Sequence, residues 1–551
     1  MKSQSNRYPG THRPTPRCVG RQFVPPGPRR LENLAAVFLD ALTPDELLRL
    51  RNSIGQHQTW PVGTVCSGSE SPLLAWHGLA AAFHSRTGQR IDVEHAFSCE
   101  LDEQKRLWIL ALFPEALVFT DALDLNKGEA RTHQGDLKAV PDHWRCAIAG
   151  FPCTAVSGQN PHAQSDENRN CIASGNLATG SLFSIIVNLA EVHLEQMERS
   201  IRAGRFVFIL LENVVNLALK GKHGTASNLD EAKAQLEATG WVVIVWHLSP
   251  KDFGVPASRP RLWIAVVPRI ALEYCGHSDE EEFRKDMFNL MDRFVGFEQA
   301  PLDRYLLPDD SPLIVDYLKG LSVKKDLKAG HVEDAVLSSG GIILPSVSKF
   351  CSAQFREPSR QSVSSLKWHK KHEKAYEQAG QPWSLALRFS EDQLDCFPGL
   401  NALVDRQMEV LDLVGVVAFP EALVRSVELK HNVERCRLAA EASCILPGGM
   451  QYLTHKCRMM HPFEALMLQG IDVSPHIVQQ FKGSLVQSLA GNAFETSCCL
   501  ATILCTMVSL SPPPRMVSPR VMPPAGEGEG GHSDSDSESF FVARVRRRRL
   551  C

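Results

Sequence analysis

Short apolar stretches recur along the first half of the chain and alternate with segments in which apolar residues have helical spacing. Seven of these stretches have the length and composition of β-strands, at residues 62–65, 91–98, 116–119, 146–149, 206–211, 241–246 and 262–267. Helical spacing fills several of the intervals, as at residues 102–113 and 229–239. Strands that alternate with helices predict an α/β fold built on a largely parallel, doubly wound sheet.

Two predicted helices follow a basic N-terminal arm. Residues 31–42 have helical apolar spacing, and Thr43-Pro44-Asp45-Glu46 is a capping box that opens a second helix to about residue 54. The arm is rich in arginine, and its prolines oppose a helix. We expect it to be disordered, either touching phosphates non-specifically or remaining a solvated tail without a partner. An organelle transit peptide fits less well, because such peptides are amphipathic.

The composition is that of a soluble globular protein of several domains. Of the 551 residues, 44% are hydrophobic and 22% are charged, and length alone suggests about three units of roughly 150 residues. No apolar run of about 18 residues occurs, so we expect no membrane span. The 16 cysteines include no Cys-x-x-Cys pair, and no signal-peptide segment opens the chain. These features indicate a reducing, intracellular setting without a structural zinc site.

Cys153 lies where the pattern most strongly indicates chemistry. The strand at residues 146–149 runs into the turn Gly150-Phe151-Pro152, which delivers Cys153 at the carboxyl edge of the predicted sheet. Open α/β folds bind their ligands at this edge. Backbone N–H groups after the cysteine would favour its thiolate, which is the nucleophilic form. The alternative is a buried core cysteine, since free Cys is among the most buried residue types.

Three other strand ends carry small or acidic residues. The turn Cys66-Ser67-Gly68-Ser69-Glu70-Ser71 joins the first strand to a helix, a shape that brings backbone amides to a nucleotide-like ligand. Glu100 follows the second strand, where a carboxylate can accept hydrogen bonds from ribose hydroxyls or, alternatively, cap the next helix. Asp121 follows the third strand.

These residues, with others further along the chain, resemble the sequence blocks of the cytosine-5 DNA methyltransferase family, in the family's usual order. The resemblance covers residues 61–268 and 451–508. Its most specific parts are the Ser67–Glu70 turn, Glu100, Asp121, Gly150-Phe151-Pro152-Cys153, Glu212-Asn213-Val214, the pair Arg259 and Arg261, and Gly491-Asn492-Ala493.

The resemblance implies a Rossmann-like fold of S-adenosyl-L-methionine-dependent methyltransferases with a second, smaller domain inserted. Cys153 would add to ring carbon 6 of a flipped cytosine, and Glu212 would share a proton at ring nitrogen 3 from a dry pocket. Arg261 would hold the exocyclic oxygen, with Arg259 beside it or on a phosphate. No metal is implied, and the residues implied to bind S-adenosyl-L-methionine are Ser67, Gly68, Ser69, Glu100, Asp121 and Asn492.

The function predicted from the resemblance is DNA cytosine-5 methylation. Two alternatives stay open: the same chemistry on RNA, which one branch of the family performs, and a non-catalytic relative that binds nucleic acid. The presence of Cys153, Glu212 and Arg261 argues against the non-catalytic alternative. The sizeable middle segment favours DNA over a compact RNA enzyme.

The predicted site has a variant cofactor block and a long loop after the nucleophile. Thr64, Cys66 and Glu70 stand where the family usually has Asp, Phe and Gly. Residues 154–180, rich in Asn, Ser and Gly, are the natural mobile loop to close over a flipped base, or else a long surface loop.

The predicted organisation has six parts: a disordered basic arm (1–30), a helical brace (31–56), the first part of the catalytic domain (57–269), a target-recognition region (270–450), the C-terminal part of the catalytic domain (451–510) and a disordered tail (511–551). Residues 367–376 interleave cations with aromatics, which suits nucleic acid or, equally, a solvated helix face. Arg544 and Arg546–Arg549 fit nuclear import, so we expect a nuclear protein. The oligomeric state is not predicted.

Overall fold

The computed structural model of the chain describes residues 10–15, 31–56, 59–158, 160, 162–163, 165–202, 205–220, 226–328, 363–378, 380, 403, 405–413, 426–430 and 439–512. The arginine cluster of the tail lies outside these residues, so the nuclear location stays a prediction.

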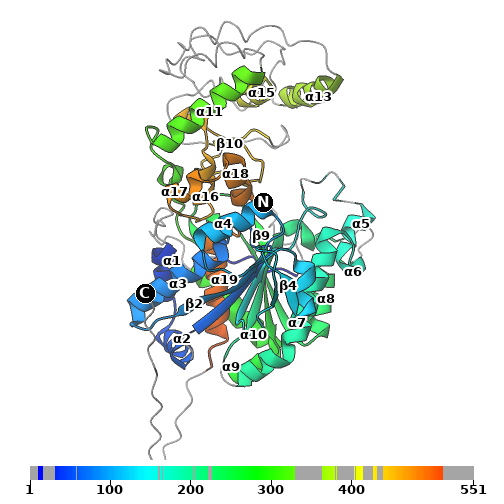
Figure 1. Cartoon of the computed structure of the whole chain (residues 1–551), viewed down its shortest axis with the longest axis vertical. Coiled ribbons are helices and arrows are strands. Elements are labelled where there is room, and N and C mark those ends of the chain that lie inside the picture. The colour runs from blue at the N-terminus through cyan, green and yellow to red at the C-terminus, as the bar shows by residue number, and fades with distance from the viewer. Residues whose placement is uncertain are drawn as a thin grey trace, which may run out of the picture. The chain divides into compact units, whose positions relative to one another are not determined.

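A seven-stranded sheet forms the centre of the described fold (Figure 1). Its neighbours from β3 to β7 pair in parallel, whereas β9 is antiparallel to both β7 and β8. The predicted α/β sheet is confirmed. The direction of β9 differs because no α-helical crossover joins it to β8, and parallel neighbours need such a crossover. In sheet order, the strands are β3 (Val118–Phe119), β2 (Asp92–Cys99), β1 (Thr59–Val65), β6 (Cys146–Ala149), β7 (Phe208–Val214), β9 (Arg261–Pro268) and β8 (Trp241–Leu248).

Side chains of the sheet alternate between two buried layers. Along β8, Val242 and Ile244 belong to one hydrophobic cluster, whereas Val243 and Val245 belong to the other. The first layer contains α1 (Leu31–Asp40), α3 (Ser71–Thr87), α10 (Glu280–Phe294) and α19 (Thr496–Ser509), and the second contains α7 (Leu177–Arg202) and α8 (Asn228–Ala238). Because helices cover both faces, inner strands such as β6 are wholly buried and apolar, whereas β2 begins with the exposed Asp92.

The two N-terminal helices form as predicted. After α1, the helix α2 (Pro44–Gln56) begins with the expected capping box. Thr43 N donates to Glu46 Oε2 over 2.7 Å, and Glu46 N donates to Thr43 Oγ1 over 3.2 Å. These reciprocal bonds satisfy amides that the helix itself leaves without acceptors.

Residues 10–15 of the basic arm lie against the edge of the sheet, which differs from the disorder expected for the arm. His12 forms a parallel bridge with Trp246 of β8, and its amide donates to Val245 O over 2.9 Å. The Arg13 guanidinium forms an ion pair with Asp252, 2.5 Å apart. Arg13 is therefore engaged inside the protein rather than available to a phosphate.

The domain boundary expected at residue 270 falls inside the packed core. Helix α9 (Ile270–Cys275) follows β9 directly, and α10 buries Phe283, Met287 and Met291 in the first hydrophobic layer beside α19. The family blocks in this part of the sequence end near residue 268, so the sequence pattern predicts a boundary there. The apolar face of α10 shows that the body containing the sheet extends to about residue 297, where Phe297 is still buried in the same cluster.

A third buried cluster joins parts of the middle segment to the C-terminal part of the chain. It draws on η7 (Leu302–Tyr305), α16 (Pro462–Met467), α17 (Pro475–Gln479), α18 (Gly483–Asn492) and Trp108 of α4 (Glu103–Leu112). Close to it along the chain are α11 (Pro312–Lys328) and a small sheet of β10 (Ser426–Glu428), β11 (Gln451–Leu453) and β12 (Arg458–Met459). The hairpin of β4 (Glu129–Arg131) and β5 (Leu137–Ala139) is a feature that the sequence reasoning missed.

The cationic run of the middle segment lies on helix α13 (Val363–Gln378). Lys370, Lys371 and Lys374 are exposed, but His372 and Tyr376 are buried. A buried tyrosine cannot stack on a base, so the described part of this run favours the solvated helix face. The side chains of residues 363–369 lie outside the described set.

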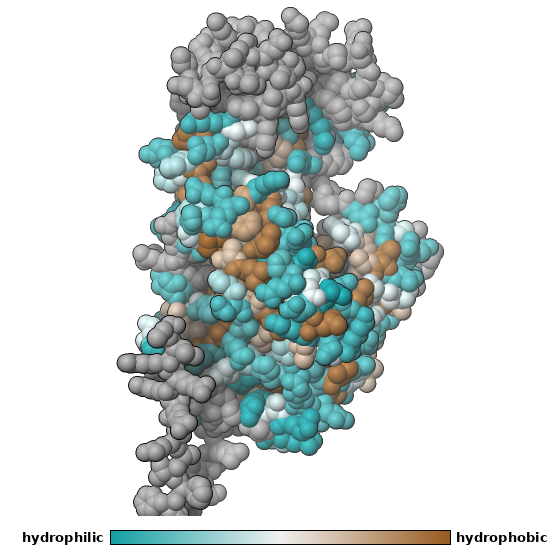
Figure 2. Space-filling view, viewed as in Figure 1, coloured by the Kyte–Doolittle hydropathy of each residue, from teal (hydrophilic) through white to brown (hydrophobic). Residues whose placement is uncertain are grey.

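Two helical segments are long and apolar enough to cross a membrane by length and composition alone: α7 and the stretch Gly483–Ser509. The second is a core segment, since every residue of α19 is buried. The face shown in Figure 2 carries hydrophilic residues interspersed with separate hydrophobic areas rather than one continuous apolar belt. Helix α7 buries one side, including Phe183, Ile186 and Leu189, in the second hydrophobic layer.

Candidate active site

The nucleophile loop is fixed by contacts that only its particular residues allow. At Gly150, directly after β6, a Cβ atom would lie 2.7 Å from the ring of Phe494, so a larger residue would displace that ring. Asn213 Nδ2 donates to Phe151 O over 3.0 Å and thereby ties the loop to β7. Sequence reasoning had identified Asn213 only as part of a block. These contacts hold Cys153, which is partly buried, at the carboxyl edge of the sheet.

Glu212 and Arg261 form an ion pair beside this loop. In the antiparallel register of β7 and β9, Glu212 faces Trp263 and Val214 faces Arg261, so the two charged side chains are diagonal neighbours on one face. Arg261 Nε lies 3.0 Å from Glu212 Oε1, and each side chain is 14% exposed. The N–H of Arg261 does not point at this oxygen, so the contact is an ion pair without a hydrogen bond. Glu212 therefore lies against an opposite charge, in surroundings that are largely shielded from solvent.

Cys153 is held as a thiol in this arrangement. Burial raises the pKa of Cys153 above its ordinary value, and the opposing effect of the Arg261 guanidinium is smaller. Glu212 raises the pKa of Cys153 further, and Arg259 lowers it. Among the described residues, no α-helix begins at Cys153 to favour its thiolate, since the next described helix is α5 (Asp166–Arg169).

The reactivity of Cys153 should rise with pH through the whole neutral range. Because the raised pKa leaves mostly thiol below it, the thiolate fraction grows about tenfold for each pH unit. We expect alkylation of Cys153 by iodoacetamide to accelerate from about pH 7 to about pH 9 without levelling. Mass spectrometry of the Cys153 peptide measures this rate, and Arg261→Gln should slow it at each pH. A plateau below about pH 8 would contradict the assigned pKa shift.

Arg259 holds a position different from the one expected. Only 4% of it is exposed, and its guanidinium donates to the backbone oxygens of Ile445, Gly491 and Ala493 over 2.9–3.0 Å. A buried guanidinium with these acceptors ties the C-terminal segment to the sheet and is not directed at a base or a phosphate. Arg261 lies beside Glu212, and its Nη2 lies 3.9 Å from the thiol of Cys444, a residue that the sequence pattern did not single out.

The predicted cofactor turn uses most of its polar groups within the protein. The amide of Ser67 donates to Cys99 O (3.2 Å), and that of Gly68 donates to Glu100 Oε2 (2.9 Å). The hydroxyls of Ser67 and Ser69 also have protein partners. The expectation that this turn presents a row of available amides is therefore wrong for Ser67 and Gly68 in this conformation.

Two acidic residues follow the neighbouring strands β2 and β3. The amide of Glu100 donates to Phe119 O over 3.1 Å, which brings Asp121 close, and Asp121 caps the 3₁₀ helix η3 (Ala122–Lys127). Leu101 and Leu123 follow these acids and are 76% and 57% exposed. Exposed leucines beside acids indicate a surface that could bind a ligand, and the sequence pattern did not reveal that these leucines are exposed.

The backbone of Asn492 lies beside the first turn, at this end of the sheet. A Cβ atom at Gly68 would lie 3.9 Å from Asn492 O, so the last block of the chain folds back onto the first turn, as the resemblance implied. The hydroxyl of Ser71 donates to Phe494 O over 2.7 Å and fixes the same approach. The Asn492 side chain itself is exposed.

The loop after the nucleophile is partly helical. Within residues 154–180 the structure has α5, α6 (Cys171–Ser174) and the start of α7. Its asparagines stabilise the loop internally: Asn160 Nδ2 donates to Thr154 O (2.9 Å) and Asn168 Nδ2 donates to His162 O (2.7 Å). Movement of this loop over a base stays a prediction.

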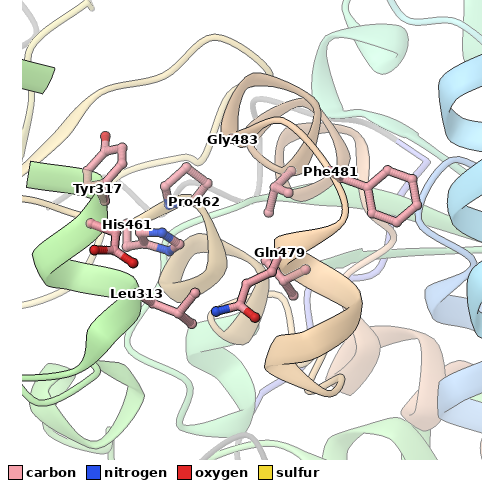
Figure 3. Close-up of a pocket in the computed structure, with 10 residues that line it drawn as sticks. Leu313, Tyr317, His461, Pro462, Gln479, Phe481 and Gly483 are labelled. Carbon is pink, nitrogen blue, oxygen red and sulfur yellow. The ribbon is translucent and has the colours of Figure 1, made fainter. Parts of the chain in front are cut away.

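A separate pocket of about 200 Å³ lies among α11, α16, α17 and α18 (Figure 3). Leu313, Tyr317, His461, Gln479 and Phe481 are among its lining residues. None of the site residues predicted from the sequence lines it. Burial lowers the pKa of His461 to about 4, and its Nδ1 accepts from Phe463 N, so this histidine serves as a helix cap.

Comparisons with known proteins identify the family of this chain. A family model described as C-5 cytosine-specific DNA methylase matches residues 78–500. This match covers more than three quarters of the sequence. The chain belongs to the C-5 cytosine-specific DNA methylase family, which uses S-adenosyl-L-methionine as methyl donor.

Two curated relatives carry the name DNA (cytosine-5-)-methyltransferase DMT5. The one from Cryptococcus neoformans is 24% identical over 454 residues, which are 79% of this chain and 16% of the relative. The one from Verticillium dahliae is 20% identical over 490 residues, which are 81% of this chain and 19% of the relative. The chain thus spans less than a fifth of either relative.

Among solved structures, a Spodoptera frugiperda DNMT2 variant is similar with a TM-score of 0.36 and 12% identity, covering 82% of this chain and 99% of that one.

Proposed function

We propose that this chain is an S-adenosyl-L-methionine-dependent DNA (cytosine-5-)-methyltransferase. The observation that carries the proposal is the grouping of Cys153, Glu212 and Arg261 at one edge of the sheet, where three neighbouring strands β6, β7 and β9 meet. The names of the two curated relatives favour DNA over RNA as the substrate.

The residues at the ends of β2 and β3 fit the methyl donor chemically. Glu100 and Asp121 offer carboxylate acceptors to hydroxyl and amino groups, and the exposed Leu101 and Leu123 offer apolar surface to a planar base. When bound there, S-adenosyl-L-methionine would supply an electrophilic methyl group.

Cys153 supplies the nucleophile that the unreactive cytosine ring requires. Its thiolate forms a bond to ring carbon 6, and the electron pair of the 5,6 double bond moves to carbon 5, which can then accept a methyl group. Loss of the proton from carbon 5 restores the double bond and breaks the bond between sulfur and carbon 6. The cysteine is regenerated, so the step splits one difficult substitution into an addition and an elimination.

Glu212 and Arg261 stabilise the charge that this addition creates. Electron density also reaches ring nitrogen 3 and the exocyclic oxygen, where Glu212 can share a proton and Arg261 can donate hydrogen bonds. For both contacts to form, the ion pair must open, or Glu212 and Arg261 must each contact the base while they remain paired. Because the ring is inaccessible in a duplex, the base must be flipped, at a cost of about a few kcal/mol.

The proposal is tested by incubating the full chain with methyl-labelled S-adenosyl-L-methionine and either duplex DNA or RNA. Label should accumulate in DNA, on carbon 5 of cytosine, and Cys153→Ala should remove it. Label found in RNA alone would overturn the substrate assignment. Absence of label from both, with a folded protein, would favour a non-catalytic relative.

Binding of the donor should depend on Glu100. Glu100→Ala removes a carboxylate that accepts from Gly68 N and Asp102 N and would accept from the ligand, so we expect the Kd for S-adenosyl-L-methionine to rise about 10- to 100-fold. Isothermal titration calorimetry measures it, and Glu103→Ala, an exposed acid nearby, is the matched control. The melting temperature should change little. An unchanged Kd would remove Glu100 from the site.

A further inference from the structure

A buried polar cluster lies beneath the predicted cofactor turn, at the end of β1 and β2. Thr64 Oγ1 is its centre, 2.8 Å from Glu70 Oε1, 2.7 Å from Ser67 Oγ and 3.1 Å from Ser98 Oγ. His95 Nε2 lies 2.5 Å from Ser98 Oγ and 3.6 Å from Glu70 Oε1. The turn is thus attached to two strands through the fully buried side chains of Thr64, Ser98 and Glu70.

Glu70 is the most constrained member of this cluster. Its backbone has a φ of 57°, in the left-handed region that favours glycine, and it is the N-cap residue directly before α3. Its side chain makes no capping bond to the helix but turns into the protein, where it is 0% exposed. Its second oxygen, Oε2, has no hydrogen-bond partner among the described residues.

The surroundings of Glu70 favour a neutral carboxyl group. Burial raises the pKa of Glu70 to about 8, and the charge of Glu100 also raises it. Hydrogen bonds with Thr64, Ser98 and Ser67 lower this pKa and partly oppose the shift. His95 is no counter-ion at neutral pH, because burial lowers its pKa to about 4. His77, further along α3, also has a pKa lowered by burial. No Lys or Arg pairs with Glu70 within the described part of the chain.

We propose that Glu70 is a positioning residue for the methyl donor, which holds the Ser67–Glu70 turn against the sheet through the hydrogen bond that its carboxyl accepts from Thr64. The inference rests on the proposed function, since it concerns the site of S-adenosyl-L-methionine. Glu70 N donates to Ser67 O over 2.9 Å and closes the turn, while Gly68 N donates to Glu100. Movement of Glu70 therefore displaces the amide that orients Glu100.

A pH dependence follows from this arrangement. The folded protein keeps the Glu70 proton well above the ordinary value of 4.5, so the free energy of unfolding falls as pH rises from about 4.5 to about 8 and then levels. Above about pH 8 the carboxylate would be a buried charge without a cation, and the turn must shift to hydrate it. Affinity for the donor should then fall about tenfold for each further pH unit.

The test is equilibrium binding of S-adenosyl-L-methionine to the full chain from about pH 6 to about pH 9.5. We compare wild type, Glu70→Gln and Glu70→Ala, with circular dichroism to monitor folding at each pH. Glutamine is neutral and hydrogen-bonding, so it should rescue binding at neutral pH and remove the alkaline decline. At about pH 9.5 it should bind about 30-fold more tightly than wild type. Glu70→Ala should bind about tenfold more weakly than wild type at neutral pH.

Three results would overturn the inference in separable ways. An identical alkaline decline in wild type and Glu70→Gln would assign the titration to another group. Wild-type affinity in a folded Glu70→Ala would show that Glu70 does not position the turn. Absence of binding by wild type at every pH would overturn the proposed function itself, and the inference with it.

Discussion

Substitution of Cys153 by alanine is expected to abolish methyl transfer, lowering its rate by a factor on the order of 10⁴ or more. Without the sulfur there is no addition to ring carbon 6, and no other group in the ion pair of Glu212 and Arg261 can replace it, because a carboxylate and a guanidinium are poor nucleophiles at this carbon. A quench-flow or filter-binding assay with labelled S-adenosyl-L-methionine measures the loss.

Binding of S-adenosyl-L-methionine should be almost unchanged in the same variant. Cys153 follows β6, which β1 separates from β2 and β3 in the sheet, and its side chain is not part of the cluster around Glu70. Cys457→Ala, at another partly exposed cysteine, is the matched control and should keep full activity. Methylation by Cys153→Ala within about tenfold of the wild-type rate would remove Cys153 from the role of nucleophile.

The largest loss of stability is expected at Glu464. Its carboxylate is fully buried and pairs with the Arg458 guanidinium through contacts of 2.7 and 2.9 Å. It also accepts from His461 N (2.7 Å) and Leu307 N (2.8 Å). Glu464→Ala would leave a buried guanidinium without this partner, so we expect the free energy of unfolding to fall by about 3–5 kcal/mol.

The contrast with an exposed partner of the same arginine makes this prediction specific. Asp309 also pairs with Arg458, over 2.9 Å, but its side chain is 53% exposed. Asp309→Ala should therefore cost less than about 1 kcal/mol. Urea unfolding followed by circular dichroism compares the two variants. Equal losses would contradict the assignment of the buried pair as the stabilising contact.

The strands and the identity of the central residues could be predicted from sequence because both are encoded locally. Apolar stretches define β6 and β7, and a residue that follows a strand must lie at the edge where that strand ends. This logic placed Cys153, Glu100 and Asp121 at strand ends, whereas the role of Glu212 was implied by the resemblance to the family. The direction of β9 was less accessible, because it depends on how β8 and β9 connect rather than on their composition.

The role of Arg259 could not be predicted, because its partners are distant in sequence. Ile445, Gly491 and Ala493 lie 186 to 234 positions away, and nothing in the spacing of Arg259 and Arg261 indicates which guanidinium is directed into the core. The same limit applies to Glu70, whose partners on β1 and β2 became evident only when the strands were paired. In the sequence, Glu70 stands out only because the family usually has glycine at this position.

The most direct test of the account is covalent trapping on 5-fluorocytosine. The full chain is incubated with S-adenosyl-L-methionine and duplex DNA that contains this base. Fluorine at carbon 5 cannot leave as a proton would, so elimination of the Cys153 sulfur stalls after methyl transfer. We predict an adduct that survives denaturing electrophoresis, requires S-adenosyl-L-methionine and maps to Cys153 by mass spectrometry. An adduct on a different cysteine, or none from a protein that binds both the donor and the DNA, would contradict the account.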